Sequence, residues 1–145
     1  MRHVGPDQFR SVMGHFVTGV TVVTANAVTS LSLEPLLLLV AFDNDARTLP
    51  VVRETGRFGV NVLAAGQAEL ARLFASKTPE REKFAGVAHT VNAGIPVIEG
   101  VLAWVGCRLE RLIPAGDHTI GIGAVEAAEA GGGEPLIWHR GEYRT

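Results

Sequence analysis

The feature that most constrains the fold is a pair of long strand-like segments joined by a short turn. Residues 102–112 and 118–128 read as two long strands, with an apolar alternating run around Cys107, and residues 114–117 between them read Pro-Ala-Gly-Asp. A period of two predicts half-buried strands, and Pro, Gly and Asp are residues that turns prefer. Parallel neighbours would need a crossover of about a dozen residues or more, so this connection indicates antiparallel pairing.

The other predicted strands also follow one another with few helices between them. We expect strands over residues 20–24, 27–33, 36–42, 58–63 and 136–139. We expect short helices from Pro6 to Gly19, from a Thr48 cap to Gly56, around residues 70–74 and from Thr78 to Phe84, with loops over 85–96 and 131–133. Strands without helical crossovers favour an antiparallel sheet closed into a barrel over a parallel Rossmann sheet. The predicted fold class is mainly β with short helices.

Composition and charge limit the classes of function. A length of 145 residues predicts one domain over residues 1–145, and the 13 scattered Lys and Arg residues with a net charge of −2 argue against a nucleic-acid partner. The apolar runs are too short to span a membrane and residues 1–9 do not resemble a secretory signal, so we expect a cytoplasmic protein with no membrane partner. Charged residues make up 19%, which favours extra buried surface between subunits.

Motifs for metal, nucleoside-triphosphate and serine-hydrolase chemistry are missing. The five histidines, at positions 3, 15, 89, 118 and 139, lack metal-ligand spacing, so no metal site is expected. Residues 121–126 begin like a dinucleotide fingerprint but end in Glu and lie inside a predicted strand. Cys107 lies in an apolar alternating run, which predicts a buried structural thiol. An enzyme with this sequence would therefore rely on an organic cofactor.

The most informative polar cluster is the segment 26–32, which reads Asn-Ala-Val-Thr-Ser-Leu-Ser. On composition alone, these hydroxyls are equally consistent with a solvated strand edge. In a binding site, hydroxyl groups and backbone amides beside Val and Leu would give a flavin ring its hydrogen-bond partners and an apolar floor.

Several motifs in this order resemble the flavin reductase-like, FMN-binding split-barrel family. The resemblance runs from about residue 9 to 143 and includes residues 26–35, 36–43, 46–48, 58–63, 67–71, Lys83-Phe84, 95–100, Cys107, 116–120 and 135–143. The shared order and spacing of these segments carry the assignment. The resemblance implies a Greek-key, antiparallel split β-barrel that forms a homodimer, with each flavin close to the subunit interface.

The same resemblance implies an NAD(P)H:flavin oxidoreductase. Such an enzyme would reduce FMN or FAD with NADH or NADPH and supply the reduced flavin, by diffusion, to a partner monooxygenase. Two alternatives stay open: a non-catalytic flavin- or haem-binding split barrel, and another split-barrel oxidoreductase such as a pyridoxamine-phosphate oxidase-like protein. The residues do not distinguish FMN from FAD or NADH from NADPH, and they do not identify the oxygenase or its substrate.

The resemblance also implies roles for individual residues. His118 is the candidate catalytic residue, near the nicotinamide site. The implied flavin-binding residues are Asn26, Ala27, Val28, Thr29, Ser30 and Ser32 along the ring, Asp43, then Arg47, Thr48 and Lys83 at the phosphate end, Phe84 beside it, and Arg140 and Tyr143 at the rim.

Simpler alternatives accompany some of these assignments. Arg47 is equally consistent with a surface ion pair, and Lys83 with a helix-surface charge. A less favoured alternative for His118 is a residue that only orders its turn. Gly121 and Gly123 share one face of a predicted strand. They either ease the curvature of the barrel or leave a bare strip for a flat ring or a second subunit.

Two departures from the family pattern stand out. The family usually has a hairpin turn between the strand that ends at Thr24 and the segment that begins at Asn26, but here they are joined directly through Ala25. A tight hairpin takes about two turn residues, often with Gly. Either one long bent strand runs through this point, or a disordered loop is omitted from this sequence, which is the interpretation we favour. The second departure, Pro35-Leu36 in place of Pro-Pro, should leave the strand intact.

Overall fold

The structure, a computed structural model, describes residues 5–13, 18–19, 21–22, 25–76, 80–92 and 94–144. Its helices are α1 (Pro6–Met13), α2 (Thr48–Thr55), α3 (Ala68–Ala75) and α4 (Glu80–Ala85). Its strands are β1 (Thr18–Gly19), β2 (Thr21–Val22), β3 (Ala25–Leu33), β4 (Leu36–Asp43), β5 (Arg57–Val62), β6 (His89–Asn92), β7 (Ile95–Ile98), β8 (Ala103–Ala115), β9 (His118–Ala130), β10 (Ile137–His139) and β11 (Glu142–Arg144). The predicted class, mainly β with short helices, is confirmed. No helix within these ranges is long and apolar enough to cross a membrane.

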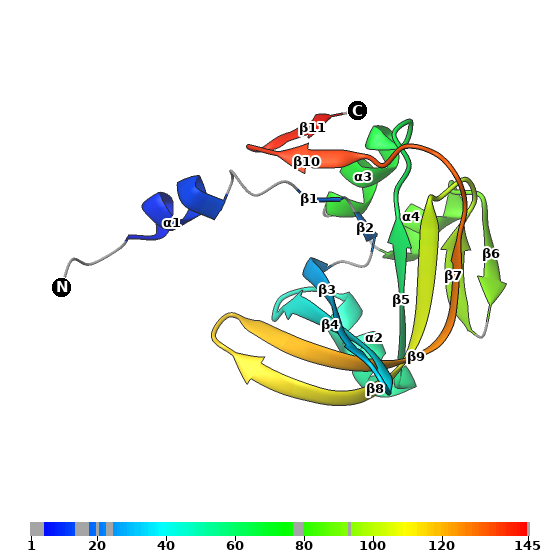
Figure 1. Ribbon diagram of the computed structural model, residues 1–145, viewed down its shortest axis with the longest axis horizontal. Helices are drawn as coiled ribbons and strands as arrows, with labels where there is room; N and C mark the ends of the chain where they lie inside the picture. Colours follow the sequence, from blue (N-terminus) through cyan, green and yellow to red (C-terminus); the bar gives the residue numbers. More distant parts are fainter. Residues whose placement is uncertain are drawn as a thin grey trace.

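A six-stranded antiparallel sheet in the order β2-β5-β8-β9-β4-β3 forms the body of the molecule (Figure 1). Its centre is the predicted hairpin: β8 and β9 pair from Ala103–Ala130 to Ala115–His118, and Gly116 in the turn has a φ of 66°. Two smaller sheets, β1-β10-β11 and β6-β7, lie beside it.

The two ends of the six-stranded sheet lie close together. β2 and β3 are the first and last strands of the sheet, yet only residues 23 and 24 separate them in the chain. Three steps between Cα atoms, from Val22 to Ala25, span at most about 11 Å. Six strands in a flat sheet would place the end strands about 24 Å apart. The sheet is therefore strongly curled, and β8 and β9 bend along their length in Figure 1.

The predicted elements are confirmed where the local pattern is strong. β3, β4 and β5 lie within about two residues of their predicted bounds, and α2 ends at Gly56, whose φ of 69° is the left-handed conformation that ends helices. The residue at the N-cap of α2 is Arg47, and it makes no side-chain capping bond. The prediction that Thr48 caps this helix is therefore wrong.

Three other local predictions are wrong. Residues 85–96, expected to form a loop, contain β6 and the first half of β7, which form a hairpin. Both strands are short, and their sequences lack a clear alternation of buried apolar and exposed polar residues. The apolar Val91 of β6 is 68% exposed, and Pro96 lies within β7. Gly19, expected to end the first helix, lies in β1, and the C-terminal β11 was not predicted.

The main hydrophobic core is formed by α2 and strands β4, β5 and β8. Its centre is a pair of rings, Phe42 and Phe58, that meet edge to face with centroids 5.7 Å apart. The other buried members are Val40, Leu49, Val52, Val60 and Cys107. A second core, under α3, contains Leu63, Ala71, Phe74, Val87, Ile98 and Leu136.

Gly121 and Gly123 of β9 make room for the two core rings. A Cβ atom at Gly121 would lie 2.7 Å from the Phe42 ring, and one at Gly123 would lie 2.6 Å from the Phe58 ring and 2.7 Å from Cβ of Cys107. These distances are shorter than any ordinary van der Waals contact. The interpretation of this strip as bare surface for a flat ligand or a second subunit is wrong, because the chain's own side chains fill it.

We predict that Gly123→Ala lowers the free energy of unfolding by about 1–3 kcal/mol, since the added methyl group must displace the Phe58 ring. The matched control is Gly132→Ala, where nothing lies within 4 Å of the added Cβ atom. The control should change stability by less than about 0.5 kcal/mol. Urea unfolding measures both values, and equal small effects would contradict the packing role of Gly123.

Cys107 should behave as an inert thiol in the folded protein. Its side chain is fully buried, and burial, reinforced by the charge of Glu126, raises its pKa to about 11. We predict that Ellman's reagent at pH 8 leaves the native protein unmodified and reacts once guanidinium unfolds it. Because the folded pKa lies above the ordinary value of 9.0, stability from this group is full below pH 9 and is lost as the pH rises through 11. Rapid modification of the native protein would contradict this placement.

Candidate functional site

A cleft of about 410 Å³ lies between β5, the start of β7 and the helices α2, α3 and α4. This volume is in the range of small-molecule sites. The cleft is lined by Thr48, Val51, Val52 and Thr55 of α2, Arg57, Phe58, Gly59 and Asn61 of β5, Phe74 of α3, Phe84 of α4, and Gly94, Ile95 and Pro96. Most of these side chains are apolar, so the cleft offers apolar walls with a small number of polar groups.

Two phenyl rings form one apolar wall of the cleft. Phe74 and Phe84 meet edge to face with centroids 4.9 Å apart. Lys83 is only 3% exposed, and its Nζ atom donates a hydrogen bond of 2.9 Å to the Phe74 carbonyl oxygen. This bond ties α4 to the last turn of α3, where the helix dipole favours a cation. The alternative that Lys83 is a helix-surface charge is therefore wrong.

A buried amide holds the opposite wall. Asn61 is 3% exposed, its Nδ2 atom donates to the Pro96 carbonyl oxygen at 3.2 Å, and its Oδ1 atom accepts from the Ile98 amide at 3.0 Å. These bonds join β5 to β7. Sequence reasoning missed Asn61, although a polar residue in the middle of an apolar strand was a usable signal, since buried amides need partners.

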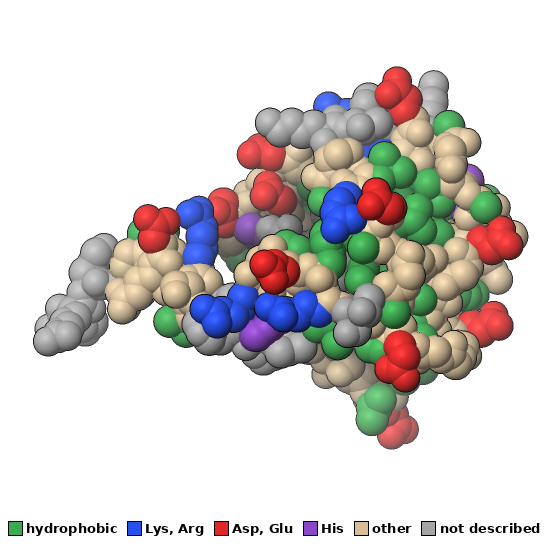
Figure 2. Space-filling model, turned by 90° about the horizontal axis from the view of Figure 1, so that it is seen from above, with side chains coloured by type: hydrophobic (Ala, Val, Ile, Leu, Met, Phe, Trp, Pro, Cys, Tyr) green, Lys and Arg blue, Asp and Glu red, His purple; other side chains and the backbone are tan. Residues whose placement is uncertain are grey.

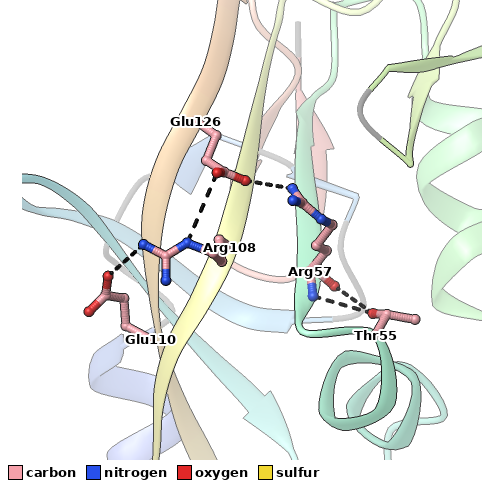
Figure 3. Close-up of polar contacts among 5 residues, drawn as sticks. All are labelled: Thr55, Arg57, Arg108, Glu110 and Glu126. Atoms are coloured by element: carbon pink, nitrogen blue, oxygen red, sulfur yellow. Dashed lines mark hydrogen bonds and ion pairs between the residues drawn. The ribbon is translucent and has the colours of Figure 1, made fainter.

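Charged groups gather around Arg57, which lines the cleft (Figure 3). Arg57 lies 2.5 Å from Glu126, and Glu126 lies 4.0 Å from Arg108, which pairs with Glu110 at 3.2 Å. The Thr55 hydroxyl accepts a bond from the Arg57 backbone amide at 3.3 Å. The Arg57 and Glu126 side chains are about 40% exposed, so the pair adds little stability. Its main effect is to hold a guanidinium, which binds phosphate or carboxylate well, at the rim.

His118 belongs to a second polar cluster, and none of its members lines the cleft. His118 is the register partner of Asp43, and its Nδ1 atom lies 2.7 Å from Oδ1 of Asp117. The hydrogen bond with His118, and then the charge of the imidazolium, lower the pKa of Asp117. Thr119, which follows His118, is buried and donates a hydrogen bond of 2.6 Å to Oδ1 of Asn44.

The hydroxyl cluster predicted to line the flavin lies on β3, at the edge of the six-stranded sheet. Ala27, Thr29 and Ser30 are exposed, whereas Val28 and Ser32 are half-buried. None of these residues lines the cleft. In the described part of the chain β3 pairs with β4 alone, so no described strand pairs with its other edge. Their role at a flavin ring stays a prediction.

The segment next to β3 leaves two expectations undecided. Thr24 and the side chain of Asn26 lie outside the described residues. Neither the placement of the Asn26 amide at the flavin nor the interpretation of the direct Thr24–Ala25 connection is therefore tested.

At the phosphate end, two of the predicted residues meet in one place: Thr48 and Phe84 both line the cleft. Lys83 lies behind this wall. Arg47 is exposed at the N-terminus of α2 and forms no ion pair with another described residue, so the alternative that it belongs to a surface ion pair is wrong.

Arg140 and Tyr143 lie in the β10–β11 hairpin and not at the cleft. Arg140 is exposed in the turn, with a φ of 52°. The Tyr143 ring meets Trp138 with centroids 4.8 Å apart and carries the Arg72 guanidinium 5.4 Å above its centre. In this chain Tyr143 packs the hairpin against α3, and its place at a pocket rim stays a prediction.

Comparison with known proteins finds relatives along nearly the whole chain. The family model described as "Flavin reductase like domain" matches residues 13–145. An NADH-dependent flavin reductase from Rhodococcus sp is 35% identical over 98% of this chain and 87% of its own length. Reductase subunit HsaB of a flavin-dependent monooxygenase from Mycobacterium tuberculosis (strain ATCC 25618 / H37Rv) is 37% identical, covering 97% of this chain and 82% of that protein.

Solved structures share the fold. The NADH:FAD oxidoreductase SgcE6 of Streptomyces globisporus superposes with a TM-score of 0.91 at 36% identity, covering 99% of this chain and 96% of that one. BorF, the flavin reductase component of a bacterial two-component tryptophan halogenase, has a TM-score of 0.88 at 37% identity, covering 97% of both chains. The alignment with the Rhodococcus protein spans 156 positions, more than the 145 residues here, so that relative has residues without a counterpart in this chain.

The curled antiparallel sheet, the apolar cleft under α2 and the agreement with these relatives over almost every residue lead to one conclusion: the chain belongs to the flavin reductase-like domain family.

Proposed function

We propose that this protein is an NAD(P)H:flavin oxidoreductase that reduces FMN or FAD and releases the reduced flavin to a partner monooxygenase. The observation that carries the proposal is the full-length similarity to proteins named as NADH-dependent flavin reductases and as reductase subunits of monooxygenases. A structure of the Streptomyces relative with NAD and FAD fragments further supports the pairing of the two nucleotides.

The chemistry of the cleft fits the phosphate end of a flavin nucleotide. Its apolar walls suit a flat or aliphatic group, and the Arg57 guanidinium at its rim suits a phosphate. Thr48 is the first residue of α2, whose N-terminal amides attract anions, and Arg47 adds a cation beside it. In this proposal Phe84 packs against the flavin, and Lys83 holds Phe84 in place through its bond to α3.

The ring end of the flavin would lie along β3. Val28, Thr29 and Ser30 would present backbone N–H groups to the side of the ring where negative charge develops, as an oxyanion hole does. Ala27, Ser32 and the Asn26 backbone would complete this edge, and Asp43, Arg140 and Tyr143 would lie at its margin. The bound flavin would supply the hydride-accepting chemistry. His118 would orient the nicotinamide, and the chain would otherwise act by positioning the two nucleotides.

We also propose that the curled sheet closes as a split barrel and that two chains form a homodimer. The contact between β2 and β3, the two end strands of the sheet, supports closure. α1 has no buried residue and extends away from the body in Figures 1 and 2. Its apolar side chains Phe9 and Val12 are therefore 59% and 63% exposed. An isolated helix of eight residues is marginal in water, so it needs a partner surface.

The β3–β4 hairpin supports the same assembly. Leu33 is 84% exposed and Leu36 is 52% exposed, and apolar groups gathered on a surface mark association sites. A second chain there would cover them and would add a wall beside the β3 hydroxyls. In this assembly the site along β3, which lies outside the cleft of the single chain, would be completed by the partner.

Flavin-dependent oxidation of NADH tests the proposed function. We expect loss of nicotinamide absorbance at 340 nm when FMN, FAD or riboflavin is added, with kcat in the usual range of about 1–1,000 per second. Repeating the assay with NADPH determines the nucleotide preference. Binding of flavin without any turnover of either nucleotide would show a carrier or sensor and contradict the proposal.

Sedimentation equilibrium tests the homodimer. We expect a species of twice the 15.4 kDa chain mass, and we expect Leu33→Glu to shift it toward the monomer because a charge would be buried in the interface. Val91→Glu is the matched control, since Val91 is also exposed but lies on β6. A wild-type monomer with full reductase activity would overturn the dimer.

A further inference from the structure

Three hydrogen bonds of Asn44 converge on the residues around His118. The Asn44 backbone amide donates to the Asp117 carbonyl oxygen at 3.0 Å, and its Nδ2 atom donates to the Gly116 carbonyl oxygen at 3.2 Å. Its Oδ1 atom accepts from the Thr119 hydroxyl at 2.6 Å. A single residue at the end of β4 therefore fixes the chain on both sides of His118.

Of the three hydrogen bonds of Asn44, the one from Thr119 is the best shielded from water. Thr119 is 4% exposed, and a buried hydroxyl that loses its partner is costly. By contrast, the Asp117 carboxylate that contacts His118 is almost fully exposed, so that contact competes with water. The backbone bonds of Asn44 are therefore a firmer hold on the segment that carries His118 than the exposed Asp117 contact is.

Asp43, the register partner of His118, does not hold the backbone around His118 as Asn44 does. Its Oδ1 atom accepts a hydrogen bond of 2.9 Å from the Asp45 amide, so its carboxylate orders its own turn. Asn44 is the residue of this segment whose side chain bonds to the β8–β9 turn.

We propose that Asn44 is a positioning residue for the nicotinamide substrate. It holds residues 116–119 in the conformation that directs His118 toward the nucleotide. The inference rests on the proposed reductase function and on the role of His118 in nucleotide use, and it adds a residue that does not itself touch either nucleotide.

The first test separates nucleotide use from flavin binding. Thr119→Val loses one hydrogen bond and should raise KM for NADH about three- to tenfold, with little change in kcat. Asn44→Ala loses two side-chain hydrogen bonds and should raise KM at least as much. Thr119→Ser keeps the hydroxyl and should stay near wild type. The control Asn92→Ala removes an exposed amide on β6 and should change nothing. The Kd for FMN, from flavin fluorescence, should stay within about twofold in every variant.

A double-mutant cycle then asks whether Asn44 acts through His118. His118→Ala should raise KM for NADH, and adding Asn44→Ala to it should cost nothing more, because no imidazole is left to position. Additive effects in the cycle would overturn the inference, as would equal loss of FMN and NADH binding in Asn44→Ala. If Asn44→Ala does not fold, the Thr119→Val and Thr119→Ser pair carries the same comparison.

The same data separate this inference from the proposed function. A wild-type enzyme that oxidises NADH with added FMN, together with a normal KM in His118→Ala, would reject the positioning role and leave the reductase standing. A wild-type protein without flavin-dependent NADH oxidation would reject both.

Discussion

The structure depends on the closeness of the two ends of the six-stranded sheet. β2 and β3 are the first and last strands of that sheet, yet they contact each other. The sheet must curl to bring these ends together. The curl gives it a concave inner face, where Leu49 and Val52 of α2 join the buried core, and an outer face. Because the curled sheet encloses the core, the candidate cleft lies outside it, between β5, β7 and the helices.

The candidate site is held by buried polar bonds more than by surface charges. Lys83 binds the carbonyl of Phe74, and Asn61 binds the backbone of β7. Both bonds are shielded from water, where a lost partner is costly. The pair between Arg57 and Glu126 is half-exposed and is therefore better suited to present charge than to maintain the fold. Buried hydrogen bonds therefore hold the walls of the cleft, whereas a half-exposed ion pair holds the guanidinium at its rim.

The sequence allowed the central elements of the fold to be predicted because their signals are local. The alternation of β3 and the left-handed Gly56 after α2 needed no knowledge of distant residues. The β6–β7 hairpin was missed because Val91 on one strand is exposed and Pro96 interrupts the other, so neither strand alternates clearly.

The candidate site was predicted only in part, for the opposite reason. Thr48 and Phe84 were selected through family resemblance and share the cleft. Arg57 depends on Glu126, 69 positions away, and no local pattern reveals that pair. Lys83 lies in a charged helix that looks solvated in sequence, and it is buried because α3 ends beside it. The role of the β3 hydroxyls remains a prediction, because Thr29 and Ser30 are exposed and lie outside the cleft of the single chain.

The packing of Phe42 and Phe58 against two glycines has a consequence for ligand exchange. In the described part of the chain these rings fill the middle of the curled sheet and leave no lumen there for a cofactor. A hollow barrel, by contrast, can hold a ligand inside. With the proposed site at the periphery, a nucleotide would associate and leave while the described strands stay paired. Such a scaffold suits an enzyme whose reduced product has to diffuse away after each turnover.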